Sequence, residues 1–185
     1  MVVIDEEENW IARSREGDHE AFGALVRRYQ RMIHALTFRM TGSSSDAEDL
    51  AQETFFTAFQ ELGGFKGDAR FSSWLYRIAT NRCLYWLKRS ERRVRAHESW
   101  AKEIANDDAP EDGGEAISKQ VQSALMKLNA KQRAAVVLTT FDNMSHAEAA
   151  AVLGCSETTV SWRVFAARRK LKHWLEPVVK GGRDD

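Results

Sequence analysis

Basic and aromatic side chains crowd the stretch from residue 74 to residue 95. Seven arginines and lysines fall there against a single acid, Glu91. Basic side chains neutralise phosphates and aromatic rings stack on unpaired bases, so this stretch predicts a surface for nucleic acid. Aromatic residues at helical spacing more often pack in a core. We therefore expect Trp74 and Trp86 to be largely structural and the basic residues to face DNA.

A second surface of this kind lies on residues 157–171. On a helical wheel of about 100° per residue, the narrow apolar face consists of Val160, Val164, Ala167 and Leu171. The opposite face and its flanks consist of Thr158, Trp162, Phe165, Arg169, Arg163, Arg168 and Lys170. A solvated face accounts for the arginines but not for two large aromatic side chains that point outward. This face therefore predicts DNA reading.

The residues before this helix complete a helix-turn-helix. Ser145 and Glu148 have the spacing of a capping box at the start of a short helix. Gly154 can take the left-handed conformation of a tight turn, and Ser156 can cap the second helix. In this motif the second helix enters the major groove of DNA.

Acidic side chains gather upstream of the basic stretch, at Asp46, Glu48, Asp49 and Glu53. Ser45 and Glu48 have capping-box spacing, and acids in a first turn suit the helix dipole, which is the simplest explanation for them. Asp49, Gln52 and Glu53, however, lie within about one helical turn. They predict a polar face suited to a basic protein partner.

The elements that position these groups are all predicted to be helices. Apolar residues recur at helical spacing over 47–62 and 71–87, and no segment alternates with the period of a strand. Residues 96–116 hold seven acidic side chains and one basic one, which predicts a flexible acidic linker. The predicted fold is all-α, with two small helical domains at 1–95 and 117–178 and a tail at 179–185.

Residue types that would support catalysis are scattered. The five histidines form no metal or triad spacing with Cys, Asp or Glu. Cys83 and Cys155 lack a CxxC spacing, which argues against a zinc site or a disulfide and suits a reducing cytoplasm. No apolar run has the length of a membrane span, and no signal peptide is recognisable. We expect a cytoplasmic protein with no catalytic residue, metal, cofactor, small-molecule substrate or membrane insertion.

Four sequence blocks follow one another between residues 10 and 176. They are Asp18–Phe22, Asp46–Phe55, Phe65–Asn81 and the helix-turn-helix with Thr159, Val160 and Arg163. In this order they resemble the start of region 2, region 2.2, regions 2.3 and 2.4, and region 4.2 of RNA polymerase sigma factors. A lone helix-turn-helix is a weak signal, whereas four ordered blocks without a third domain are typical of the extracytoplasmic-function (ECF) group.

The resemblance implies roles for the N-terminal residues. Asp49, Gln52 and Glu53, with Asp46 beside them, match positions that bind the clamp coiled coil of core RNA polymerase. The loop 65–70 and the following helix match the element that reads the −10 promoter region and holds a flipped base. The matching residues are Phe65, Lys66, Gly67, Asp68, Arg70, Trp74, Arg77, Asn81, Arg82, Lys88 and Arg89.

The resemblance also implies that the helix 157–171 reads the −35 element. The matching residues are Thr158, Thr159, Ser161, Trp162, Arg163, Phe165, Arg168 and Arg169. Ser161 stands where the family usually has a basic residue, Trp162 where it has a small polar one, and Ala166 where arginine is frequent. The −35 sequence therefore cannot be taken from better-known members.

The implied partners are core RNA polymerase, promoter DNA and an anti-sigma factor that clamps both domains. The acidic linker matches a segment that passes through the RNA-exit path of polymerase. Two other functions stay open. A free-standing helix-turn-helix regulator would use 1–95 for dimerisation or sensing, but the acidic helix and the loop with Asn81 speak against it. An enzyme is disfavoured because the histidines are scattered.

Overall fold

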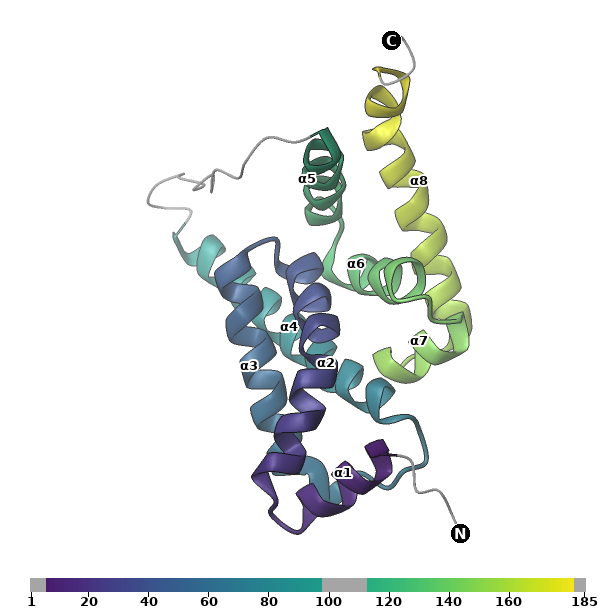
Figure 1. The fold of residues 1–185 in the computed structure, drawn as a ribbon. Coiled ribbons are helices and arrows are strands. Elements are labelled where there is room, and N and C mark those ends of the chain that lie inside the picture. Colours follow the sequence, from purple (N-terminus) through teal and green to yellow (C-terminus); the bar gives the residue numbers. More distant parts are fainter. Residues whose placement is uncertain (1–5, 98–112, 182–185) are drawn as a thin grey trace.

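The computed structural model describes residues 6–97 and 113–181, and all regular structure within these ranges is helical (Figure 1). The N-terminal region holds α1 (Glu6–Arg15), α2 (His19–Thr41), α3 (Ser44–Glu61), the short 3₁₀ helix η1 (Leu62–Gly64) and α4 (Phe71–His97). The C-terminal region holds α5 (Gly113–Met126), α6 (Ala130–Val136), the π-helical turn η2 (Val137–Phe141), α7 (His146–Leu153) and α8 (Glu157–Gly181). The predicted all-α fold is confirmed.

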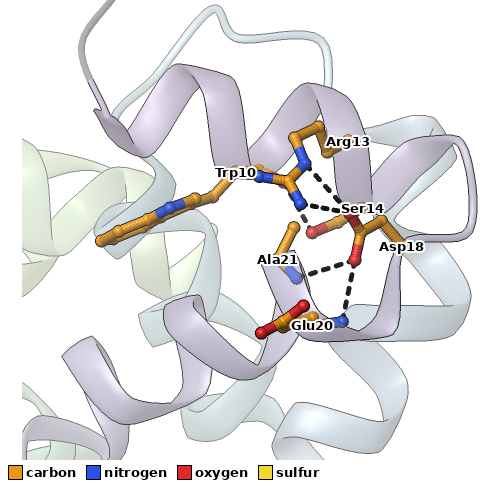
Figure 2. A network of polar contacts seen from close by, with 6 residues as sticks. All are labelled: Trp10, Arg13, Ser14, Asp18, Glu20 and Ala21. Carbon is orange, nitrogen blue, oxygen red and sulfur yellow. Dashed lines mark hydrogen bonds and ion pairs between the residues drawn. The ribbon is translucent and has the colours of Figure 1, made fainter.

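The start of α2 is fixed by a carboxylate that also ties it to α1. Asp18 Oδ1 accepts hydrogen bonds from the backbone N–H groups of Glu20 and Ala21, at 2.9 and 3.0 Å (Figure 2). Its Oδ2 accepts from the Arg13 guanidinium at 2.6 Å. The Ala21 N–H and then Arg13 hold the pKa of Asp18 below its ordinary value, because both favour the charged carboxylate.

The predicted cap of α3 is wrong by two residues. Ser43, not Ser45, is the N-cap, and its Oγ accepts a hydrogen bond from the backbone N–H of Asp46 at 3.3 Å. Gly42 ends α2 at φ 77°, so the chain turns sharply and α3 begins one residue after the cap. α3 ends at Glu61 and passes directly into η1 at Leu62–Gly64.

The helix-turn-helix has the predicted local structure. Ser145 and Glu148 form a capping box at the start of α7, and Gly154 ends it at φ 61°. Ser156 Oγ accepts from the Thr159 N–H at 3.2 Å and so caps α8. Val160, Val164 and Ala167 are buried, as the helical wheel predicts. However, α8 runs on to Gly181, so part of the expected tail is helical.

The two regions pack against each other rather than lying apart. One continuous hydrophobic cluster contains Phe71, Leu75 and Ile78 of α4 together with Leu138 and Val152 of the C-terminal region. α7 packs against α4, and α5 packs against α2. The expected linker at 96–116 lies mostly outside the described residues, and its two ends belong to α4 and α5.

Candidate protein and nucleic-acid interfaces

The acidic face of α3 is open to solvent. Asp49, Gln52 and Glu53 are all exposed, and Asp46 is half-buried. Glu53 lies 3.8 Å from the Arg82 guanidinium, a loose surface pair that contributes little to stability. Three of the four residues expected to bind polymerase are therefore exposed on α3, and Asp46 is partly covered.

Phe56 extends this face and was missed by the sequence analysis. It follows Gln52 and Glu53 by one helical turn, and its side chain is 64% exposed. Its neighbour Phe55 is buried, so only one phenylalanine of the pair serves the core. The apolar stripe at helical spacing over 47–62 includes Phe55 and leaves Phe56 off it, so this spacing was the signal that could have found the exposed ring. An exposed aromatic ring beside carboxylates fits a partner that is both basic and apolar.

The loop expected to read the −10 element rests on a buried aromatic base. Phe65 is buried, and its ring lies 5.5 Å from the Phe71 ring and 5.3 Å from the Trp74 ring. Arg15 of α1 donates hydrogen bonds to the carbonyls of Phe65 and Leu62. The buried ring of Phe65 and the hydrogen bonds from Arg15 therefore hold the loop in position. No spacing in the sequence predicts this role for Arg15.

The other loop residues face outward. The exposed members of the expected set are Lys66, Gly67, Asp68 and Arg70. Gly67 has φ 79°, a conformation that side-chain-bearing residues rarely adopt, so it lets the loop turn. The loop forms one wall of a cleft whose other walls include Trp74 and Arg77 of α4 and Val152 of α7.

A polar and aromatic row runs along the exposed side of α4. Arg77, Asn81, Tyr85 and Arg89 follow one another at intervals of four residues, and all are exposed, as is Lys88. Tyr85 is 67% exposed, so its ring belongs to this row and not to the core. The row combines cations, an amide and an aromatic ring, which suits a nucleic-acid strand.

Arg82 lies apart from this row. Its guanidinium donates a hydrogen bond to Thr57 Oγ1 at 2.6 Å and approaches Glu53. Arg82 therefore ties α4 to α3, beside the acidic face. Sequence position alone grouped it with the basic residues of α4, because its partner lies 25 residues earlier in the chain.

On α8 the predicted aromatic face is exposed. Trp162 is 68% exposed and Phe165 is 67% exposed, with Thr158, Arg168 and Arg169 also exposed. Thr159 and Arg163 are half-buried, and the Arg163 guanidinium lies 3.5 Å from Cys155 Sγ. A cleft between α6 and α8 is bordered by Lys131, Trp162 and Arg163.

Ser161 has a partner inside the helix-turn-helix. Its Oγ lies 2.8 Å from His146 Nδ1 of α7, and the residue is half-buried. The side chain thus joins the two helices of the motif. The resemblance placed Ser161 among the −35 readers and gave no indication of the contact with α7.

The remaining chemistry-bearing residues form no cluster within the described parts of the chain. Cys83 is buried, and this burial raises the pKa of its thiol, while Cys155 is half-buried. Within residues 6–97 and 113–181, no group of three or more His, Cys, Asp or Glu side chains is arranged to hold a metal ion. None of the helices described is both long and apolar enough to cross a membrane.

These surfaces define a helical DNA-binding protein, and comparisons with known proteins give its family. Residues 25–93 match the model for Sigma-70 region 2, and residues 118–171 match the model for Sigma-70, region 4. The ECF RNA polymerase sigma factor SigM of Mycobacterium tuberculosis is 38% identical over 165 residues, covering 89% of this chain and 82% of SigM. The chain therefore belongs to the ECF family of RNA polymerase sigma factors.

Solved structures support the same assignment. CnrH, solved in complex with the cytosolic domain of CnrY, superposes with a TM-score of 0.69 and 29% identity over 94% of this chain and 99% of CnrH. The sigma factor RpoE of Bartonella quintana, solved with the anti-sigma factor NepR, gives a TM-score of 0.72 and 25% identity over 84% and 96% of the two chains.

Proposed function

We propose that this sigma factor binds core RNA polymerase through the exposed face of α3. The observation that carries the proposal is the placement of Asp49, Gln52 and Glu53 on one exposed face, with Phe56 one turn further on. Carboxylates attract a basic partner surface, and a central aromatic side chain excludes water from the contact. The carboxylates set orientation and association rate, and Phe56 adds apolar burial.

Charge reversal tests this assignment. Asp49→Lys together with Glu53→Lys places two cations where the partner is expected to be basic, and core affinity should fall at least about tenfold. Glu61→Lys is the matched control, because it reverses an exposed acid at the far end of the same helix. Helicity and melting temperature should hold in both proteins. Unchanged core affinity in the double variant would remove α3 from the interface.

We further propose that the loop 65–70 and the exposed row of α4 read the −10 element as a single strand. Arg77 lines the cleft beside the loop. Asn81 is exposed one turn further along α4, and Lys88 and Arg89 continue the row. The cations neutralise phosphates, while Asn81 can hydrogen-bond a base edge and Tyr85 can stack on a base. The packed rings of Phe65 and Trp74 hold the loop in place, and Arg82 ties α4 to α3.

For the −35 element we propose that α8 reads duplex DNA in the major groove. Trp162 and Phe165 project from the face opposite the buried Val160 and Val164. Apolar side chains in a major groove pack against thymine methyl groups, and arginine pairs with guanine or phosphate. Arg168 and Arg169 are placed for the second kind of contact.

The proposed activity is binding and duplex opening within holoenzyme, without catalysis or a cofactor of its own. The protein acts in the cytoplasm, where polymerase and DNA are found.

An anti-sigma factor is a further proposed partner. The Bartonella relative was solved with one, and the exposed aromatic side chains of α8 offer such a protein apolar area to cover. The expected passage of residues 96–116 along the RNA-exit path lies largely outside the described residues.

A further inference from the structure

His146 and Ser161 join the two helices of the helix-turn-helix through their side chains. His146 is the first residue of α7, and its Nδ1 lies 2.8 Å from Ser161 Oγ on α8. Both residues are half-buried, so the pair lies at the boundary between the packed interior of the motif and solvent. The hydrogen bond therefore holds a polar group at the edge of the surface proposed to read the −35 element.

Each partner is held in place by its own helix. The capping box of Ser145 and Glu148 fixes the first turn of α7, on which His146 lies. On α8, Ser161 directly follows Val160, which is buried. α7 and α8 also pack against each other. The distance between the ring and the hydroxyl is thus set by two rigid elements, as is typical of pre-organised binding sites.

Packing already holds the two helices together without this pair. Ala149 and Val152 of α7 and Val160 and Val164 of α8 are all buried in one hydrophobic cluster. A half-buried hydrogen bond adds only modestly to stability, because it replaces hydrogen bonds that both groups make with water in the unfolded chain. The main consequence of the bond is therefore the orientation of the two side chains.

Ser161 lies on the side of α8 that continues into the proposed reading face. Phe165 and Arg168 follow it by four and seven residues, a spacing that places all three side chains on one side of the helix. Phe165 and Arg168 are exposed. Arg163 lies on the opposite flank, beside Cys155. A base pair that meets the ring of Phe165 would therefore lie close to the Ser161 hydroxyl.

A serine hydroxyl has one hydrogen to donate and two lone pairs to accept with. The bond to His146 uses one of these three, and the others then point in fixed directions. A hydroxyl without a fixed partner rotates to suit the group it meets, so it bonds equally to donors and acceptors on base edges. The ring of His146 removes this freedom.

We propose that His146 is a positioning residue for −35 recognition: it orients the Ser161 hydroxyl, which then reads the edge of one base pair in the major groove. This role rests on the proposed function of α8 at the −35 element. It also accounts for the departure at position 161, where the family usually has a basic residue. A cation there would bind guanine or phosphate, whereas an oriented hydroxyl selects a base edge without adding charge.

A −35 preference profile, measured with holoenzyme that carries full-length variants, tests the proposal. Ser161→Ala removes the hydroxyl and should reduce the preference at one base pair about fivefold, the usual contribution of one hydrogen bond. His146→Ala should reduce the preference at that same base pair and leave the other positions unchanged. The two substitutions together should give no further loss, because the ring acts only through the hydroxyl.

Two further variants of His146 separate orientation from packing. His146→Asn keeps a hydrogen-bonding group near the position of Nδ1 and should restore most of the preference. His146→Gln carries its amide near the position of Nε2 and should not restore it. His173→Ala, which removes an exposed histidine further along α8, is the matched control and should leave the profile unchanged. Melting curves followed by circular dichroism report any loss of stability in each variant.

Three outcomes would overturn the proposal. An unchanged profile in His146→Ala or in Ser161→Ala would mean that the oriented hydroxyl reads no base. A uniform loss of affinity across all −35 sequences in His146→Ala, with a shallower salt slope, would mean that His146 binds phosphate instead. Equal profiles for His146→Asn and His146→Ala would mean that the ring serves packing alone.

Failure of the proposed function would give a different result. If α8 does not read the −35 element, a triple variant with Trp162→Ala, Phe165→Ala and Arg169→Ala would also keep the wild-type profile. If only the role of His146 is wrong, the triple variant loses the −35 preference while His146→Ala retains it.

Discussion

The two proposed promoter-reading surfaces are built in different ways. The −10 surface combines an irregular loop with one side of α4, and the loop is held by the buried ring of Phe65 and by Arg15. The −35 surface is one side of a regular helix, where Trp162 and Phe165 project opposite a buried stripe. Substitutions of the residues that hold the loop should therefore change the position of the loop and the stability of the fold. Substitutions on the exposed side of α8 should instead remove contacts with DNA.

The largest expected effect is a loss of stability when a residue that holds the −10 loop is truncated. Phe65→Ala removes a buried ring that packs against two others, so the free energy of unfolding should fall by about 3–5 kcal/mol. Phe56→Ala is the matched control, since the same side chain is largely exposed there and stability should change little. Urea unfolding followed by circular dichroism gives both values. Equal losses in the two variants would contradict the buried support of the loop.

The next effect is a loss of promoter opening with no change in the stability of the protein. Asn81→Ala removes an exposed amide from the α4 row, so stability should hold. Loss of one hydrogen bond to an unpaired base should weaken opening by about tenfold, a contact of roughly 1.4 kcal/mol. Permanganate reactivity of unpaired thymines in holoenzyme complexes measures it, while −35 affinity serves as the internal reference. Asn9→Ala, which removes an exposed amide on α1, is the matched control. If thymine reactivity is the same with the Asn81→Ala and Asn9→Ala variants, Asn81 does not read the promoter.

The same contrast explains how far the sequence analysis reached. The helix-turn-helix was predicted in detail because its signals are local: Ser145, Gly154 and Ser156 act within four residues of themselves. Ser43 was missed as a cap because Ser45 offers the same local signal. The contacts of Arg82 with Thr57 and of Arg15 with the loop join residues far apart in sequence. The spacing of residues within one helix cannot predict such contacts.

On α8, Trp162→Ala should change sequence preference and not salt dependence. A good specific contact contributes about 1–3 kcal/mol of discrimination between bases. Replacing Trp162 should therefore flatten the preference at one or two −35 positions. A binding profile across −35 variants, measured with holoenzyme at two salt concentrations, reports both properties. If the profile is unchanged, the aromatic face is not a base reader, and coverage by an anti-sigma factor becomes the better account.

Arg168→Ala should give the smallest and most uniform effect. A phosphate contact contributes sequence-independent affinity, so the slope of log affinity against log salt should become less negative by about 0.9. Lys172→Ala, an exposed cation one turn further along α8, is the control. A change in base preference without a change in slope would mean that Arg168 pairs with a base instead.

We expect the two promoter-reading surfaces to act only as parts of holoenzyme. Footprinting of a target promoter with the full chain, with core polymerase, and with both together tests it most directly. Holoenzyme should protect both the −35 and −10 elements and open the duplex, whereas the free chain should give no specific footprint at the same concentration. A tight, sequence-specific footprint by the chain alone would contradict this account and favour a free-standing helix-turn-helix regulator.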